Sequence, residues 1–265
     1  MPRPVGSDRR HFLMSAGGAA LAGVAGPARG QSEAKQSPPP DVGSKFTADG
    51  RVMRFAGNTV ICHLPQQGPA ASCFDALMDI YREAAGHAFV QKVALLPPSS
   101  YHMTVFGAAN DSDRRPRHWP TGVASDAPIS VCSKVLADRL RGFKSETTLP
   151  IRMRVDLAEP AADERPLTLR LLPHDSAENA RLRKLRDRLA QAIGIQTPDH
   201  DKYRFHITLG YLVAWLTPDE NEAFRSRMRD WREMVAARAP TIELGAPEFC
   251  TFDDMFAFHR QFYLA

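Results

Sequence analysis

Two short segments of the chain share one pattern, in which a histidine is followed by any residue, a threonine and then apolar residues. They are residues 102–106 (HMTVF) and 206–210 (HITLG). Residues two apart in a β-strand face the same side, so each segment would place its imidazole and hydroxyl on one face and bury Met103 or Ile207 on the other. Two such strands would supply two imidazoles and two hydroxyls to one cleft. That set suits metal-free acid–base chemistry on a phosphate ester.

The context of the two segments, more than the short pattern itself, indicates function. A third copy begins at His174, but it follows Pro173, no apolar run comes after it, and Asp175 predicts the start of a helix. Either of the other two histidines alone would be equally consistent with a hydrogen-bonded structural residue. Two matching motifs, each inside an apolar segment, favour a shared functional site.

The chain around the motifs repeats at about 104 residues, the separation of His102 and His206. Each half predicts the order strand, helix, motif strand, helix, strand. The elements besides the motifs are expected at 58–64, 74–85, 131–143 and 151–157, and again at 167–172, 177–193, 220–237 and 241–244. This order indicates an internal duplication and an α+β fold of two lobes, about 45–160 and 161–265, related by a pseudo-twofold axis. We expect antiparallel sheets to line a central cleft, with helices outside.

Residues 1–30 have the features of a twin-arginine export signal. Arg9 and Arg10 precede a weakly apolar stretch, 14–28, that is shorter than the roughly 20 residues of a membrane-spanning helix, and small residues near its end offer a cleavage site. The alternative is a chance basic N-terminus on a cytoplasmic protein. We expect an exported, periplasmic protein that is monomeric and has no membrane span.

The positive charge of the chain is concentrated in this leader. The full sequence carries a formal net charge of +4, and residues 1–30 hold four arginines against one aspartate, a net of +3, so the remainder carries +1. A nearly neutral domain lacks the broad basic surface with which proteins grip long nucleic acids. A small phosphodiester or an oligonucleotide end is therefore the expected substrate.

Residues 31–44, with three consecutive prolines, predict a flexible linker before a folded domain at 45–265. Four cysteines are present, at Cys62, Cys73, Cys132 and Cys250. Their spacing is not that of a metal site, and it is consistent either with disulfides in an exported protein or with buried free thiols. The histidines outside the motifs also lack ligand spacing, which argues against a metallophosphatase.

Paired motifs of this kind in a duplicated α+β chain resemble the two-histidine (2H) phosphoesterase superfamily, which includes RNA 2′,3′-cyclic phosphodiesterases and 2′-5′ RNA ligase-like proteins. The resemblance covers roughly residues 45–265 and is longest at 96–106 and 203–211. These stretches look most like an uncharacterised branch of the superfamily, so the resemblance indicates the chemistry better than the substrate.

The resemblance implies catalytic roles for four residues, without a metal or cofactor. His102 and His206 would act as general acid and general base, in an order that the sequence does not assign. Thr104 and Thr208 would donate hydrogen bonds to the non-bridging phosphate oxygens, where charge accumulates in the transition state.

Residues near the motifs complete the expected site. Lys202 and Arg204 would share the face of His206 if the second motif strand began early, and could then bind a phosphate; the alternative is solvated charges at a strand end. Phe106 shares the face of His102 and could stack on a base. Three aromatic residues on the opposite face are expected in the core: Tyr101, Phe205 and Tyr211.

The leading hypothesis is therefore a metal-independent phosphodiesterase that opens 2′,3′-cyclic phosphates or related small phosphodiesters. One alternative is a non-catalytic module of the same fold that binds nucleotides or phosphorylated ligands. Another is a ligase or transesterase for RNA ends, which export makes less favourable because intracellular RNA would be out of reach. The sequence does not identify the physiological substrate or the product regiochemistry.

Overall fold

The computed structural model describes residues 37–158 and 167–264. They belong to a unit that begins at Ser37. The predicted export signal and residues 31–36 of the predicted linker lie outside the described residues. Among the helices that are described, none is long and apolar enough to cross a membrane.

Residues 37–44 pack against the fold, although the sequence predicts a linker there. Pro39 is buried, Val42 packs against the core, and Asp41 forms a 2.8 Å ion pair with Lys45. Residues 37–44, before the expected start at residue 45, are thus packed, because apolar residues between the polar ones reach the core.

The described helices and strands follow the predicted order. The α-helices are α1 (Ser72–Ala84), α2 (Ile129–Leu140), α3 (Ser176–Ile193) and α4 (Pro218–Arg238). The strands are β1 (Gly57–His63), β2 (Val93–Leu95), β3 (His102–Asn110), β4 (Ile151–Val155), β5 (Thr168–Pro173), β6 (His206–Thr208), β7 (Gly210–Leu212), β8 (Ile242–Leu244), β9 (Glu248–Phe252) and β10 (His259–Tyr263). The sequence does not predict β2, β9 or β10, and the second motif strand is interrupted at Leu209, which separates β6 from β7.

Strands from both halves of the chain form one antiparallel sheet in the order β10-β9-β1-β3-β6-β5-β4-β8. The motif strands β3 and β6 are neighbours near its centre, paired at Met103 and Ile207. β4 of the first half pairs with β5 of the second half, and β9 of the second half pairs with β1 of the first half and carries β10 beside it. Each half therefore contributes strands to the other half's side of the sheet. The α+β class is confirmed, and the two motifs meet side by side in a single curled sheet.

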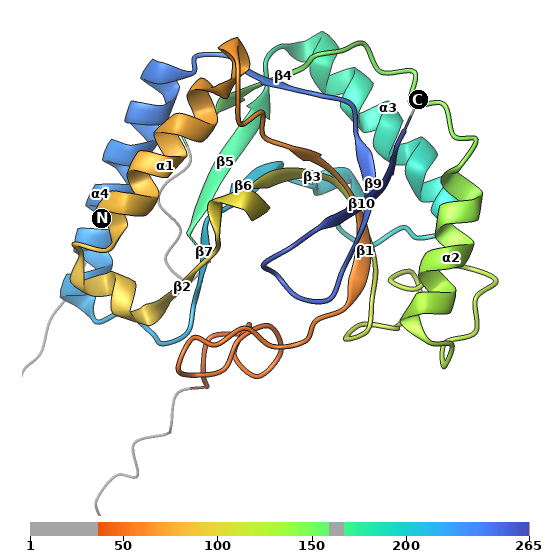
Figure 1. The fold of residues 1–265 in the computed structure, drawn as a ribbon, viewed down its shortest axis with the longest axis horizontal. Helices are drawn as coiled ribbons and strands as arrows, with labels where there is room; N and C mark the ends of the chain where they lie inside the picture. The colour runs from red at the N-terminus through yellow and green to blue at the C-terminus, as the bar shows by residue number, and fades with distance from the viewer. Residues whose placement is uncertain (1–36, 159–166, 265) are drawn as a thin grey trace, which may run out of the picture. The chain divides into compact units, whose positions relative to one another are not determined.

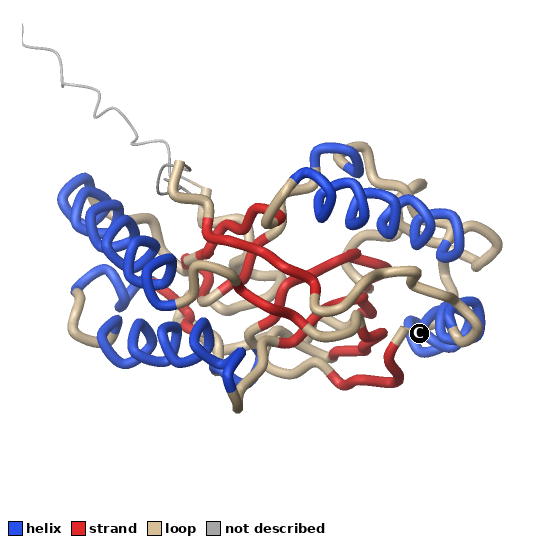
Figure 2. Tube along the Cα trace, turned by 90° about the horizontal axis from the view of Figure 1, so that it is seen from above, coloured by secondary structure: helices blue, strands red, loops and turns tan. Residues whose placement is uncertain are grey.

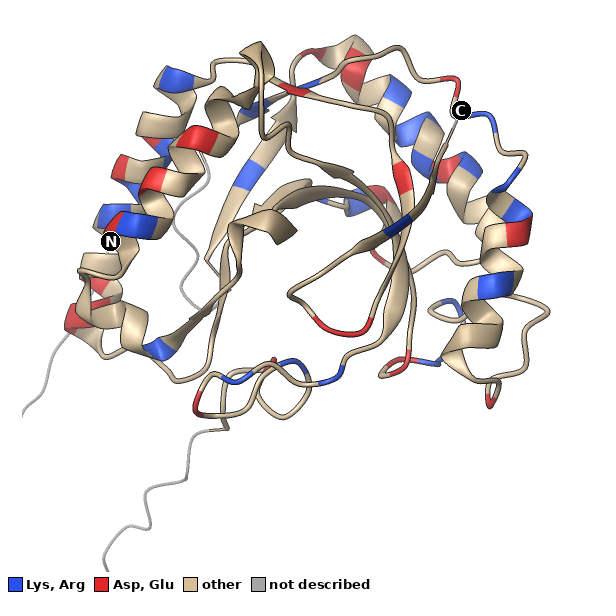
Figure 3. Ribbon diagram, viewed as in Figure 1, with Lys and Arg blue, Asp and Glu red and all other residues tan. Residues whose placement is uncertain are grey.

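Helices lie outside the sheet in two pairs, α1 with α4 and α2 with α3 (Figures 1 and 2). Each pair joins one helix from residues 45–160 with one from residues 161–265, so the two halves of the chain are interleaved. Acidic and basic residues are interspersed along these helices, whereas the strands between them carry few charges (Figure 3). Some of these charged residues are exposed, such as Lys184 and Arg229, whereas Glu178, Arg186 and Arg232 are buried. The apolar faces of the helices turn to the sheet.

Local signals explain where the helices of the second half begin and end. The Asp175 carboxylate accepts a hydrogen bond from the Glu178 amide at the start of α3, and Gly194, with a φ of 77°, ends the helix in the left-handed conformation that glycine favours. Thr217 and Glu220 form a capping box at the start of α4. Leucines on one side of α3 are buried against the sheet, at positions 182, 185 and 189.

The middle residues of the motifs anchor both strands in this core. Met103 and Ile207 are 0% exposed. Because side chains alternate across a strand, their burial turns the histidine and threonine of each motif to the other face of the sheet.

Candidate active site

The register of β3 and β6 brings the four motif side chains together as two neighbouring pairs. Pairing of Met103 with Ile207 in antiparallel strands sets His102 beside Thr208 and Thr104 beside His206. All four residues line one cavity of about 310 Å³. The predicted convergence of the two motifs is present in the structure, and the imidazoles are close enough for the charge of His206 to affect His102.

Both imidazoles are held in the same orientation. Nδ1 of His102 donates a hydrogen bond to the Ser100 carbonyl oxygen at 2.7 Å, and Nδ1 of His206 donates to the Arg204 carbonyl oxygen at 2.9 Å. A carbonyl oxygen only accepts, so Nδ1 carries a proton in each ring. Nε2 is then the nitrogen that each histidine can offer to a ligand, as a base when neutral and as an acid when protonated.

His102 occupies an enclosed position at the edge of the cavity. The ring of Phe258 lies against it, with the ring centroids 4.2 Å apart. Burial lowers the pKa of His102 to about 4; nearby His63 and His206 act in the same direction, and the hydrogen bond to Ser100 and the charge of Glu248 act against it. The neutral form therefore dominates at pH 7, which suits a proton acceptor.

Lys45 brings a positive charge to the cavity. Its Nζ lies 2.8 Å from Asp41 and 4.6 Å from the centroid of the Tyr211 ring. The Tyr211 hydroxyl donates a hydrogen bond to the Met255 sulfur at 3.7 Å. Burial alone would lower the pKa of Lys45, but Tyr211 and Asp41 raise it more, so the net shift is upward. The charged ammonium of Lys45 therefore lines the same cavity as Thr208, which is expected to bind phosphate.

Apolar side chains form another part of the wall. They come from the segment before β1, from the approach to β3, and from β9 and the loop that follows it: Phe55, Leu96, Phe252, Met255 and Phe258. The cavity thus combines polar groups that match a phosphate with rings that match a flat apolar group.

Arg170 of β5 lies beside the second motif. It pairs in register with His206, and its NH1 is 3.4 Å from Nδ1 of that ring. The shorter contact of Nδ1 is with the Arg204 carbonyl, so the guanidinium lies alongside the imidazole as a neighbouring positive charge. An arginine inside an otherwise apolar strand is the sequence signal that could have indicated it.

Three residues that the sequence places at the site lie elsewhere. The register of β1 and β3 shifts between Val60 and Ile61, which breaks the alternation and turns Phe106 into the core at 3% exposure, near the ring of His200. It is absent from the cavity lining, so the stacking role is corrected. Lys202 and Arg204 also do not line the cavity, because β6 begins only at His206 and the condition for a shared face fails.

Of the three aromatic residues expected in the core, Tyr211 is the one that departs from the prediction. Tyr101 and Phe205 are each 1% exposed, as expected for core residues. Tyr211 is largely buried too. Because the strand is interrupted at Leu209, the alternation of side chains does not continue from β6 to β7, and the Tyr211 side chain lines the cavity. Lys45 and Tyr211 are site residues that alternation alone could not identify.

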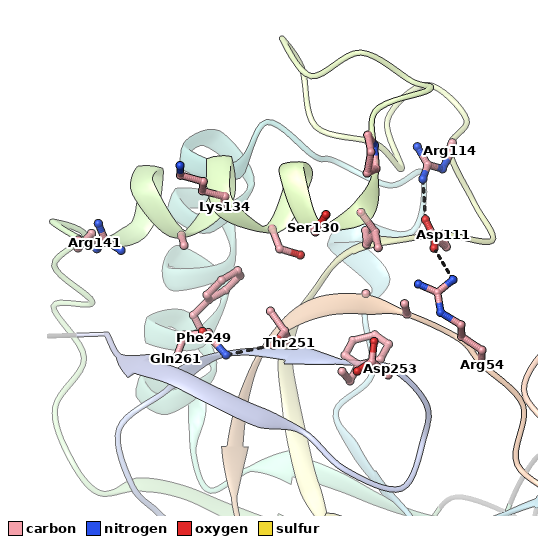
Figure 4. A pocket seen from close by; sticks show the side chains of 17 residues that line it. Arg54, Asp111, Arg114, Ser130, Lys134, Arg141, Phe249, Thr251, Asp253 and Gln261 are labelled. Atoms are coloured by element: carbon pink, nitrogen blue, oxygen red, sulfur yellow. Dashed lines mark hydrogen bonds and ion pairs between the residues drawn. The ribbon is translucent and has the colours of Figure 1, made fainter.

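A larger cavity of about 650 Å³ lies between α2 and strands β9 and β10 (Figure 4). Its lining includes no histidine or cysteine. Asp111 forms ion pairs with Arg54 at 3.3 Å and with Arg114 at 2.6 Å, and Gln261 donates a hydrogen bond to Thr251. Because it offers no acid–base couple, we assign the chemistry to the smaller cavity.

The remaining nucleophiles and metal-ligating groups are not part of the cavity. All four cysteines are buried free thiols, and burial raises the pKa of Cys73 and of Cys250 to about 12, which makes them unreactive. In the described part of the chain, the group of side chains with the spacing of a metal site consists of Asp187, His200 and Asp201, and these residues do not line the cavity.

Comparisons with family models and with solved structures give matches, and a comparison with curated proteins gives none. Residues 45–164 match the family model 2H-phosphodiest, described as a domain of unknown function (DUF1868). A crystal structure of the conserved protein of unknown function ATU0111 from Agrobacterium tumefaciens str. C58 is 30% identical in sequence, with a TM-score of 0.77 over 87% of this chain and 94% of that chain. No curated protein matches the sequence.

Proposed function

The chain belongs to the 2H phosphodiesterase family, and from that membership we propose that it is a metal-independent phosphodiesterase that hydrolyses 2′,3′-cyclic phosphates or related small phosphodiesters. The observation that carries the proposal is the convergence of two imidazoles and two threonine hydroxyls on one cavity. A site that only binds a phosphate needs no acid–base couple.

In the proposed reaction, neutral His102 accepts a proton from water through Nε2 while the water oxygen attacks phosphorus. The bond between phosphorus and one ribose oxygen breaks, and protonated His206 delivers its proton to that oxygen. Proton removal and delivery thus occur at different rings, and one proton must return from His102 to His206 through solvent before the next cycle.

The other polar groups of the cavity stabilise charge on the phosphate. Thr104 and Thr208 donate to its non-bridging oxygens, and Lys45 supplies a cation beside Thr208. The Tyr211 ring, 4.6 Å from Nζ of Lys45, lies beside this cation and lines the same cavity.

The size and lining of the cavity favour a small substrate. A volume of about 310 Å³ accommodates a nucleotide-sized ligand, and the phenyl rings of Phe55, Phe252 and Phe258 offer apolar faces to a base. The low net charge of the chain outside its first 30 residues supports a short ligand over a long nucleic acid.

The test is turnover of a panel of cyclic and linear phosphodiesters by the purified protein in the presence of EDTA. We expect hydrolysis by the wild type and its loss in His102→Ala and His206→Ala, with thermal unfolding to verify that both variants fold. Undiminished turnover in both variants rejects the proposal. Tight binding without turnover, measured by calorimetry, would support the binding module, and joined RNA ends among the products would support ligase activity.

We also propose that the protein is exported by the twin-arginine pathway, on the evidence of Arg9 and Arg10 ahead of a weakly apolar stretch. Replacement of both arginines with lysine should retain the protein in the cytoplasm of a host that has this pathway. An unchanged distribution between cytoplasm and periplasm would contradict export by this route.

A further inference from the structure

A third histidine stands next to the proposed base. His63 is the last residue of β1 and pairs directly with His102 on β3, and the centroids of the two rings are 6.1 Å apart. His63 is not a motif residue and does not line the cavity. It is close enough to His102 to affect its charge without contacting the substrate.

A buried carboxylate holds His63 in place. Nδ1 of His63 lies 2.5 Å from Oε1 of Glu248, and the His63 amide donates to the same oxygen at 3.3 Å. Glu248 is 2% exposed, and its second oxygen lies 3.5 Å from Arg260. Burial raises the pKa of Glu248, but His63 and Arg260 lower it more, so the net shift is downward and the carboxylate is ionised.

The second motif has a different neighbour at the matching place. His63 faces His102 from the strand that flanks the first motif, and Arg170 faces His206 from the strand that flanks the second. The pseudo-symmetric site is thus flanked by an imidazole–carboxylate pair on one side and by a guanidinium on the other.

The charged groups around His102 come from several elements. His63 lies on β1, His206 on β6 and Glu248 on β9, with Arg260 of β10 behind Glu248. Lys45 lines the same cavity. Among the described groups with the largest effect on His102, namely His63, His206 and Glu248, the negative charge is that of Glu248, so Glu248 can offset a positive charge formed there. The Asp41 carboxylate is ion-paired with Lys45.

We propose that Glu248 and His63 form a positioning pair for His102. The carboxylate offsets the positive charge that His102 acquires when it accepts a proton, and the protonation state of His63 determines how much of the carboxylate charge is available for this. This inference rests on the proposed function, in which His102 is the base. Neutral His63 leaves the carboxylate to stabilise the His102 imidazolium. Protonated His63 neutralises the carboxylate and opposes a second positive charge.

The two members of the pair should therefore shift His102 in opposite directions. We expect Glu248→Gln to lower the pKa of His102 and His63→Gln to raise it, each by roughly half a unit or more. The measurement is an NMR titration of the wild type and both variants with histidine labelled at Cε1. His259→Gln, which removes an exposed histidine of β10, is the matched control and should leave the His102 titration unchanged.

Kinetics provide a second readout that a purely structural pair would not change. Glu248→Gln should reduce kcat with KM nearly constant, because the offset is needed when the proton is transferred. If a variant fails to fold, the wild type alone still tests the coupling, since the signal of His102 should then respond to protonation of His63.

Titration and turnover separate the two proposals. Shifts of the His102 pKa in opposite directions in the two variants support the pair. If no phosphodiester is hydrolysed as well, the proposed function is rejected and the pair is retained. Shifts that are absent or have the same sign, or a His102 signal in the wild type that does not respond to His63, overturn the pair, whatever the activity.

Discussion

The two histidine–threonine motifs are nearly equivalent in sequence and occupy neighbouring strands, yet their surroundings differ. Each histidine donates through Nδ1 to the carbonyl oxygen two residues earlier, so the rings themselves are held alike. The first is enclosed by Phe258 and flanked by His63 with Glu248; the second is flanked by Arg170.

This difference shows how a duplicated fold can divide one reaction between two copies of the same residue. Acid–base catalysis needs one ring that is neutral and one that is protonated at the start of the reaction. Identical surroundings would give both rings the same proton affinity. The difference that favours a neutral His102 is its enclosure, to which Phe258 contributes. The charge of Arg170 beside His206 acts against protonation of that ring, so it does not by itself make His206 the acid.

The largest expected effect is the loss of either imidazole. His102→Ala and His206→Ala should each reduce kcat by about a hundred- to ten-thousand-fold, the usual contribution of a general acid or base, and should do so to a similar degree if the roles are divided. Steady-state kinetics on the best substrate of the panel give the values. His174→Ala is the matched control, because this exposed histidine begins the third copy of the motif. Near-normal kcat in one of the two variants would mean that only one ring transfers protons.

Loss of a motif hydroxyl should have the next largest effect. Thr104→Val and Thr208→Val should each reduce kcat about a hundred- to a thousand-fold, as removal of other oxyanion donors does, whereas Thr→Ser at the same positions keeps the donor. Thr251→Val is the control, since this hydroxyl lines the larger cavity and accepts from Gln261. Equal losses in the valine and serine variants would show that packing, and not the hydroxyl, is responsible.

The sequence predicts the positions of the catalytic side chains because they depend on local alternation. A histidine and a threonine two residues apart must share a face once the residue between them is buried, and Met103 and Ile207 are. The helices were predictable for the same reason, from leucine spacing and from caps such as Asp175.

The rest of the site depends on contacts between distant parts of the chain. The register shift opposite Val60 turns Phe106 inward, and the break at Leu209 turns Tyr211 toward the cavity. Lys45 and Glu248 reach the site from the segment before β1 and from β9, far from either motif. Alternation within one strand carries no information on register shifts or on which strands become neighbours.

Removal of the Lys45 ammonium, which lines the cavity with Thr208, should cause a smaller loss of activity. Lys45→Met should reduce kcat/KM about ten- to a hundred-fold, the value of a hydrogen bond to a charged group, with much of the change in KM. Lys184→Met is the control, because that side chain is 72% exposed on α3 and pairs with Glu146. Unchanged kinetics in Lys45→Met would remove this residue from phosphate binding.

The smallest expected effect is on stability, and it tests the enclosure of His102 without any substrate. The pKa of His102 is about 4 in the folded protein, below the roughly 6.5 of an unfolded histidine, so between these values unfolding takes up a proton. The free energy of unfolding should therefore fall as pH decreases through this window, by at most about 1.4 kcal/mol per pH unit from this group. Urea unfolding at several pH values should show a shallower dependence in His102→Gln, whereas His259→Gln, at an exposed position, should follow the wild type. Identical slopes in all three proteins would mean that His102 can be protonated in the folded state as readily as in the unfolded chain, and the basis for assigning it as the base would be lost.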